Sequence, residues 1–443
     1  MENTISDTSY LTLVGHVQSG KTIEEINYCF YSVNHQNIPV IFLVRNITAD
    51  QLQLRNRFLE TKSDLSVQIL SSLKIPEAVD FLSKTGILIS LCNHHQLEKI
   101  KEILTIFKGE YNLCIDEVDF SVKTKDETSM IDPLLSQLKE GANHILGATA
   151  TPFALFSCET NLTKIKKIKP AKNYRGIDTL TINYVKPNIT LHARSDYLTI
   201  KKIYTSLLKK DNCILLHSVH KNKAVHHDLQ EYISIKFPEF TVITYNGDGI
   251  RVICPTRKLV PFVKNKTVNK YGIIIKYYII ESTDLVYHLF ENYNISEVLQ
   301  ILKNDPIHNH QFISIISGHL ASRGISFVSS DYSLHLTDQY FSPGTNTHGE
   351  NLLQSLRILG CYKDNNPLTL WCSEQTWKLI VQQNNFINNL VNACDNSKQW
   401  LVQIQEISII KPENPLTRPK LMQGVKFNSQ KLEISYQKLE NTF

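Results

Sequence analysis

The segment from Gly15 to Thr22 constrains the fold of this chain more than any other stretch. It reads GHVQSGKT, follows an apolar run from Leu11 to Val14, and precedes residues with the apolar spacing of a helix. The pattern G-x-x-x-x-G-K-T between a strand and a helix is typical of a phosphate-binding loop, in which backbone N–H groups and the helix N-terminus face phosphate oxygens. A Gly/Ser turn that matches by chance is the alternative. We expect an α/β domain that binds a nucleoside triphosphate.

The residue types in this loop suit the parts of a triphosphate. Lys21 has the length to reach the β- and γ-phosphates, and the Thr22 hydroxyl is a natural ligand for Mg²⁺. The other residues expected to contact the nucleotide are Gly15, Gln18, Ser19 and Gly20.

A second chemical centre follows the predicted strand at residues 111–115, which leads directly into Asp116 and Glu117. Two carboxylates at the end of an apolar strand are costly unless a cation lies beside them. Asp116 would hold Mg²⁺ through its water shell, and Glu117 would orient and deprotonate an attacking water molecule. A solvated acidic turn is the alternative.

A third segment, ILGATATP at residues 145–152, predicts a strand that ends in two hydroxyl residues. Thr149 and Thr151 would hydrogen-bond to the acidic loop, and Pro152 would stop the strand. The continuous apolar runs at residues 38–44 and 86–91 predict further buried parallel strands. The first part of the chain therefore reads as one parallel α/β domain.

The composition is that of a globular protein. Hydrophobic residues make up 42% and charged residues 20% of the 443 residues, and this length suggests two or three domains. The net charge of +5 permits a polyanionic partner without requiring one. Because we find neither a secretory signal nor an apolar run long enough to cross a bilayer, we expect a soluble intracellular protein, in the cytoplasm or nucleus, with no membrane partner.

The cysteines and histidines do not predict a metal site. The nine cysteines are scattered without a C-x-x-C pair, which favours reduced thiols over zinc ligands or a disulfide framework. No sulfur or carboxylate completes a metal set around the clustered histidines of the second half. We expect these histidines on loops and helix surfaces: His217, His220, His226 and His227.

From Tyr197 onward, strands and helices alternate again, as in a second parallel α/β domain. The lysine-rich stretch before it lacks periodicity and predicts a connection that lies along a phosphate backbone or in solvent. The predicted divisions are a first domain at residues 1–156, a connection at 157–195, a second domain at 196–397 and an extension at 398–443.

An insertion at about residues 247–306 interrupts this second domain. Its first part is basic, and residues 271–280 predict a β-rich run. A basic hairpin with aromatic residues would grip a nucleic-acid strand, and an ordinary surface insertion is the alternative. The residues expected to contact nucleic acid in this insertion are Lys264, Lys266 and Lys270.

In their order along the chain, GHVQSGKT, IDEVD and GATATP resemble motifs I, II and III of superfamily-two helicases and translocases. They are particularly similar to the Z-one type of helicase-like ATPase, which accompanies DNA-modifying systems, and to helicase-like ATPases of large DNA viruses. In the second half, SGHLASRGISF at residues 317–327 resembles motif V, and QSLRILG at residues 354–360 resembles motif VI. The resemblance covers roughly residues 10–390.

The resemblance implies two RecA-like domains with ATP and Mg²⁺ in the cleft between them and nucleic acid across their top. Lys21, Thr22, Asp116 and Glu117 match the ATP and Mg²⁺ residues of the family. If the protein is viral, its place would be the host cell. The absence of a glutamine-bearing motif before residue 15, and DEVD in place of DEAD, argue against the RNA-helicase branch. The preference for DNA over RNA rests on the family resemblance.

The second-half motifs would supply the rest of the catalytic site. Arg357 would be the arginine finger, with Gln354 beside it and Gly324 near the nucleotide. The commoner pattern has a second arginine close to the position of Cys361, so the choice between Arg357 and Arg323 stays open. The remaining residues expected to contact nucleic acid are Arg45, Thr149, Thr151 and Ser322.

These patterns predict a nucleic-acid-stimulated ATPase that moves along or unwinds DNA, and less favourably RNA. One alternative is a DNA-packaging or nuclease-coupled motor, which would need a cluster of metal-binding carboxylates in the second half. Another is a non-catalytic helicase-fold scaffold, against which the intact Lys21, Asp116 and Glu117 argue.

Overall fold

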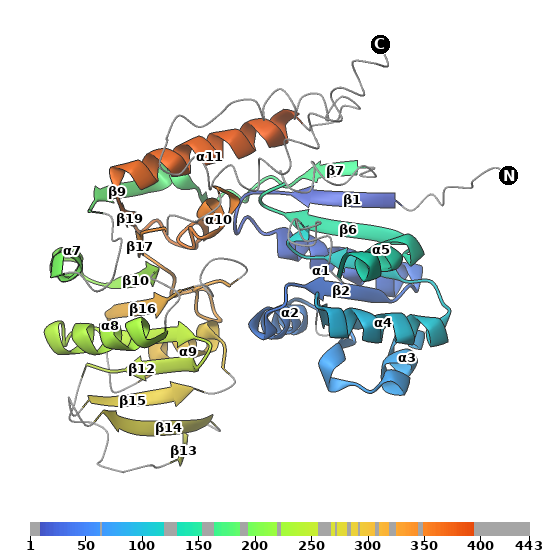
Figure 1. The fold of residues 1–443 in the computed structure, drawn as a ribbon, viewed down its shortest axis with the longest axis horizontal. Coiled ribbons are helices and arrows are strands. Elements are labelled where there is room, and N and C mark those ends of the chain that lie inside the picture. Colours follow the sequence, from blue (N-terminus) through green and yellow to red (C-terminus); the bar gives the residue numbers. More distant parts are fainter. Residues whose placement is uncertain are drawn as a thin grey trace. The chain divides into compact units, whose positions relative to one another are not determined.

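The computed structural model describes residues 9–62, 64–118, 131–152, 164–186, 194–218, 223–255, 267–270, 273–280, 285–290, 293–305, 310–318, 325–343 and 349–393. The chain divides into two compact units, one formed by residues 1–171 and 382–443 and the other by residues 172–381. Each unit contains one large sheet (Figure 1). No helix in the described ranges is long and apolar enough to cross a membrane.

The sheet of unit 1 is seven-stranded, and every strand pair in it is parallel. The strand order is β3-β4-β2-β5-β6-β1-β7. The strands are β1 (Ser9–Val14), β2 (Val40–Val44), β3 (Val67–Ile69), β4 (Ile87–Leu91), β5 (Asn112–Ile115), β6 (His144–Thr149) and β7 (Lys164–Lys167). The α-helices between them are α1 (Lys21–Tyr31), α2 (Thr48–Thr61), α3 (Ile75–Ser83), α4 (His94–Phe107) and α5 (Ile131–Gly141).

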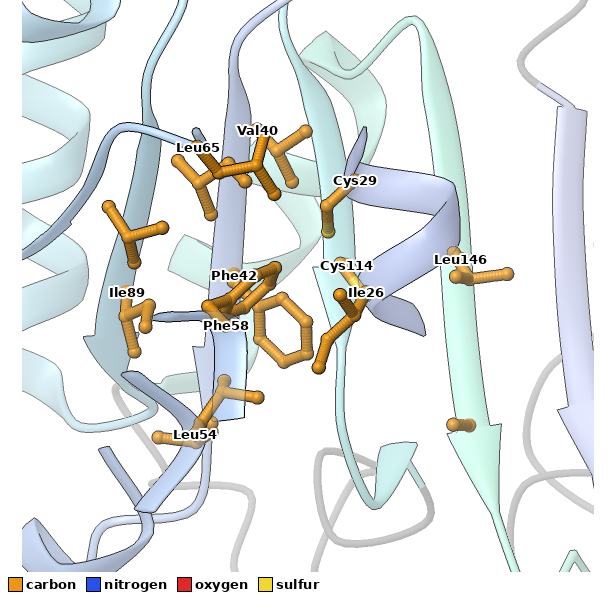
Figure 2. Packing of buried hydrophobic residues seen from close by; sticks show 14 of the residues in the cluster. Ile26, Cys29, Val40, Phe42, Leu54, Phe58, Leu65, Ile89, Cys114 and Leu146 are labelled. Atoms are coloured by element: carbon orange, nitrogen blue, oxygen red, sulfur yellow. The ribbon is translucent and has the colours of Figure 1, made fainter. Parts of the chain in front are cut away.

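Continuous apolar sequence explains why this sheet is parallel and buried. Every residue of β2 and of β4 is buried, as expected for strands that carry helices on both faces. In the core, Phe42 of β2 packs edge-on against Phe58 of α2, with ring centroids 5.9 Å apart. Cys29 of α1 and Cys114 of β5 belong to the same cluster (Figure 2). This core fixes α1 and α2 against the strands that lead into the predicted site.

Unit 2 contains a ten-stranded sheet in the order β13-β14-β15-β12-β11-β16-β10-β17-β19-β9. Its parallel part consists of β9 (Leu180–Tyr184), β10 (Cys213–Ser218), β11 (Thr241–Asn246), β16 (Phe312–Ser317), β17 (Asp338–Phe341) and β19 (Leu368–Cys372). Its antiparallel part consists of β12 (Gly249–Ile253), β13 (Thr267–Lys270), β14 (Ile273–Ile280) and β15 (Leu285–Phe290).

The helices of unit 2 alternate with the parallel strands. They are α7 (Arg194–Leu207), α8 (Lys223–Lys236), α9 (Ile295–Lys303), α10 (Gly349–Gln354) and α11 (Glu374–Ala393), whose last residues fall in unit 1. A separate two-stranded ribbon pairs β8 (Tyr174–Arg175) with β18 (Gly360–Cys361). The predicted α/β class is confirmed, with an all-parallel sheet in unit 1 and, in unit 2, a sheet whose parallel part is extended by the antiparallel strands of the β-rich insertion.

Two sequence interpretations outside the site differ from the structure. The stretch at 157–195 contains regular structure, because β7 pairs with β1 in unit 1 and β9 pairs with β19 in unit 2. The expected surface position of the histidines is wrong for His217 and His226, whose side chains are 0% and 2% exposed. The division between the units, after residue 171, falls within the predicted connection. His220 lies outside the described residues.

Candidate nucleotide site

The Gly15–Thr22 loop joins β1 to α1 at the carboxyl edge of the unit 1 sheet. Gly15 N donates to Thr149 O at 3.2 Å, which ties the loop to the end of β6. Gly20 caps α1 with φ of 96°, a left-handed conformation that favours glycine, and a Cβ there would meet no atom within 4 Å. Gln18 is also left-handed, with φ of 55°. The backbone of the loop therefore turns at Gln18 and Gly20, with open space beside Gly20.

Lys21, the first residue of α1, directs its ammonium group back over this loop. Nζ donates to His16 O at 2.9 Å and to Gly15 O at 3.4 Å, and the residue is only 8% exposed. The Ser19 hydroxyl is buried nearby and has no hydrogen-bond partner among the described residues. A phosphate oxygen would provide a partner for both groups, because a buried hydroxyl without one is costly. These residues therefore fit a nucleotide phosphate.

Asp116 and Glu117 form the turn that follows β5. Asp116 N donates to Leu43 O at 3.0 Å, which fixes the turn against β2, and Glu117 is left-handed with φ of 50°. Burial raises the pKa of Asp116 above its usual range, and the Asp50 carboxylate raises it further. Lys21 opposes that rise and is therefore close enough to interact electrostatically with Asp116. A divalent cation beside Asp116 would act in the same direction as Lys21.

Glu25 is an acidic residue of this site that the sequence interpretation missed. It lies on α1 and is fully buried, and Cys114 Sγ donates to its Oε1 at 4.0 Å. Burial raises the pKa of Glu25 well above its usual range, and Asp116 and Glu117 raise it further. The available signal was spacing, since Lys21, Glu25 and Cys29 recur every four residues on the buried face of α1.

Helix α2 and the strand before it also place charged side chains at this edge. Arg45 Nη2 and Asp50 Oδ2 are 2.8 Å apart, and both side chains are buried. Arg45 was predicted to contact nucleic acid, and in this structure its guanidinium pairs with Asp50 inside unit 1. Arg57 Nη1 donates to Thr22 Oγ1 at 3.4 Å. Asp50 and Arg57 were not assigned from the sequence, because a charged residue on a helix usually indicates a solvated face.

The threonines at the end of β6 support the loop from inside unit 1. Thr149 and Thr151 are both fully buried, and Thr151 N donates to Thr149 Oγ1 at 2.9 Å. Since Thr149 O also accepts from Gly15 N, this turn positions the phosphate loop directly. That Thr149 and Thr151 contact nucleic acid stays a prediction.

Among the predicted residues of unit 2, Gln354 and Arg357 are described and buried, 1% and 4% exposed. Arg357 Nε donates to Ile325 O at 2.9 Å, Nη2 donates to the same oxygen, and Nη1 donates to Gln354 O at 3.0 Å. The guanidinium is thus hydrogen-bonded to backbone carbonyls of its own unit. The role of Arg357 as an arginine finger stays a prediction.

The remaining residues of the predicted site lie outside the described ranges or are placed only by their position in a strand. Ser322, Arg323, Gly324, Lys264 and Lys266 lie outside the described residues, and Lys270 is the last residue of β13. Within the described ranges, no group of three or more His, Cys, Asp and Glu side chains could hold a metal ion. A Mg²⁺ ion on a nucleotide needs no such group, because it takes most of its ligands from phosphate and water.

The sequence matches no protein-family model and no curated protein. Many solved structures are similar to this chain in fold, and two helicases are among them. The DUF1998 helicase MrfA bound to DNA and AMPPNP has a TM-score of 0.49 and 13% identity, over 86% of this chain and 48% of that chain. The Mycobacterium smegmatis helicase Lhr bound to ssDNA and AMP-PNP has a TM-score of 0.49 and 10% identity, over 89% of this chain and 51% of that chain. This chain spans about half the length of each, and such distant likeness carries no conclusion about activity.

Proposed function

We propose that this chain is an ATP-dependent helicase or translocase of superfamily two that acts on nucleic acid, DNA in preference to RNA. The observation that carries the proposal is the grouping of Lys21, Thr22, Asp116 and Glu117 at one edge of the unit 1 sheet. Electrostatic interaction links Asp116 to Lys21, and Glu25 to both acidic residues and to Lys21. The sequence motifs of the second half, in their order, support a motor over a simple nucleotide-binding domain.

The residues of unit 1 divide the work of hydrolysis. Lys21 would move from the carbonyls of its own loop to the β- and γ-phosphates, a short change for a flexible side chain. Thr22, and Asp116 through water, would hold Mg²⁺, which would neutralise charge on the phosphates. Glu117, fixed in its left-handed turn, would take the proton of the attacking water.

One observation favours a second candidate, a nucleotide-binding scaffold without efficient turnover. The Arg357 guanidinium is occupied by Ile325 O and Gln354 O, so an arginine finger at this position would have to leave those bonds. A motor whose finger stays buried would bind ATP and hydrolyse it slowly, because such a finger contributes a rate factor of about 10³–10⁵.

The experiment that tests the proposal is ATP hydrolysis by the full chain, alone and with single-stranded DNA, duplex DNA or RNA. We expect DNA to raise the turnover number, and Lys21→Ala to lower turnover at least about 100-fold, because a preorganised cation on the phosphates is lost. Displacement of a labelled strand would distinguish unwinding from translocation. No turnover with any polymer would favour the scaffold and contradict the proposal.

A further inference from the structure

Helix α2 brings one arginine to the magnesium side of the phosphate loop. Arg57 Nη1 donates to the hydroxyl of Thr22 at 3.4 Å, although the two residues are 35 positions apart in the chain. Arg57 is thus adjacent to Thr22, one of the two residues that would hold Mg²⁺.

The fold fixes this position of Arg57. Its neighbour Phe58 is fully buried and packs edge-on against Phe42 of β2, so the rotation of α2 about its axis is set by the core (Figure 2). At the start of α2, the Arg45–Asp50 ion pair is also buried. With both ends of the helix anchored, Arg57 projects from a rigid element, the placement that precise ligand contacts require.

The strand order shows from which side Arg57 approaches. Strand β2 lies next to β5 in the sheet, and α2 follows β2, so α2 belongs to the part of the sheet that carries Asp116. Thr22 and Asp116 would hold Mg²⁺, and the ion would neutralise charge on the β- and γ-phosphates. Arg57, which reaches Thr22 from this part of the sheet, would therefore lie near the same phosphates.

Mg²⁺ and the Arg57 guanidinium would repel each other at the Thr22 hydroxyl. Coordination of Oγ1 to a divalent cation would place two positive charges side by side. The guanidinium would then turn to the nearest anionic oxygens, and its planar fork of donors matches phosphate. A movement of a single side chain would bring it there.

We propose that Arg57 is a phosphate-binding residue that contacts the γ-phosphate from within unit 1. The assignment rests on the proposed function, since it concerns the same nucleotide site. It gives the site a cation additional to Lys21, supplied by the same compact unit. Arg57 would also distinguish ATP from ADP, because only ATP carries the group that it contacts.

The test is the affinity of the full chain for a non-hydrolysable ATP analogue and for ADP, each with Mg²⁺, measured by titration calorimetry. We expect Arg57→Ala to weaken the analogue about 10- to 100-fold, the range of one charge-assisted hydrogen bond, and to weaken ADP less than about 3-fold. Arg57→Lys would retain part of the affinity, because it keeps the charge and loses the fork. Arg55→Ala, two residues earlier on the same helix, is the matched control and should leave both affinities unchanged.

Equal weakening of the analogue and ADP would overturn the assignment, because it would mean that Arg57 acts only by holding Thr22. Unchanged affinity for the analogue in Arg57→Ala would also overturn it. If the wild-type chain bound neither nucleotide, the proposed function would fail and this assignment with it. Thermal unfolding of each variant shows whether the fold is retained, so loss of structure is distinguished from loss of contact.

Discussion

At the scale of residues, two residues of the nucleotide site have a left-handed backbone conformation, which L-amino acids rarely adopt. Gln18 and Glu117 have φ of 55° and 50°. Such conformations cost about 1–3 kcal/mol each and persist where the surrounding structure imposes them. Here the bonds from Gly15 N to Thr149 O and from Asp116 N to Leu43 O hold the two turns. The strain thus falls on the turns proposed to bind phosphate and activate water.

The charges around these turns also favour a divalent cation. Asp116 and Glu117 raise the pKa of Glu25, and Lys21 opposes them. With Asp50, four carboxyl groups face the three cations Lys21, Arg45 and Arg57, so the site is short of positive charge when all four carboxyls are ionised. Mg²⁺ would supply it, which is the physical reason that we place the ion between Thr22 and Asp116.

The sequence predicted Arg357 as an arginine finger, and in the structure its guanidinium is hydrogen-bonded to backbone carbonyls of unit 2. Because its guanidinium donates to two backbone carbonyls, Arg357→Ala should lower the free energy of unfolding by about 2–4 kcal/mol, the cost of leaving buried carbonyls without donors. Denaturant unfolding of the full chain measures this. The control is Arg175→Ala, which loses one bond at the surface, to Asn366 O, and should change stability by less than about 1 kcal/mol.

The opposite result would restore the role implied by the resemblance. An arginine finger acts on the transition state, so its loss would lower turnover about 10³-fold or more with unfolding unchanged. Unchanged stability of Arg357→Ala would therefore contradict the structural role, and a turnover loss of that size beside it would support the arginine-finger role.

At the scale of elements, β10 carries a titratable side chain into the core of unit 2. His217 contacts Tyr204 of α7 and Tyr340 of β17, with ring centroids 6.4 Å and 4.8 Å apart, and has His226 of α8 nearby. Neither ring nitrogen has a hydrogen-bond partner among the described residues. Burial and, to a smaller extent, the neighbouring His226 lower the pKa of His217 to about 3. The fold thus requires the neutral imidazole.

This burial makes unit 2 less stable in acid. The unfolded chain binds a proton on His217 below about pH 6.5, whereas the folded chain does not until about pH 3, so stability falls as pH decreases through that interval. Between pH 7 and pH 5 the loss attributable to His217 should be about 2 kcal/mol. His217→Leu, which keeps a buried apolar volume, should remove that part of the pH dependence in denaturant unfolding. The exposed His95→Gln variant should retain it, and an unchanged slope in His217→Leu would contradict the account.

Elements with continuous apolar sequence could be predicted closely, and those with mixed sequence could not. β2 and β4 lie inside the predicted apolar runs, because a strand buried on both faces leaves no polar position. β7 was missed because lysines dominate it, as is common at a sheet edge, where charge prevents further pairing. His217 was misplaced because a lone histidine reads as polar whether it is buried or exposed.

At the scale of the whole molecule, the motifs predicted two α/β units because residues that bind phosphate in such folds follow directly after strands. The loop at Gly15–Thr22 and the Asp116–Glu117 turn lie at the predicted edge of unit 1. Glu25 could have been identified from its four-residue spacing from Lys21 on α1, whereas Arg57 could not, because its role depends on which face of α2 is turned to the site. Side-chain packing decides that, and one sequence does not reveal it.

The central claim for the whole molecule is that nucleotide binding at unit 1 changes the affinity of the chain for nucleic acid. The most direct test uses Glu117→Gln, which should bind ATP and hydrolyse it too slowly to release it during the measurement. We would measure the affinity of this variant for labelled single-stranded DNA with and without Mg²⁺ and ATP, beside Lys21→Ala. A motor predicts that ATP changes the DNA affinity of Glu117→Gln at least about 5-fold and leaves that of Lys21→Ala unchanged. Equal DNA affinity of Glu117→Gln with and without ATP would contradict the account.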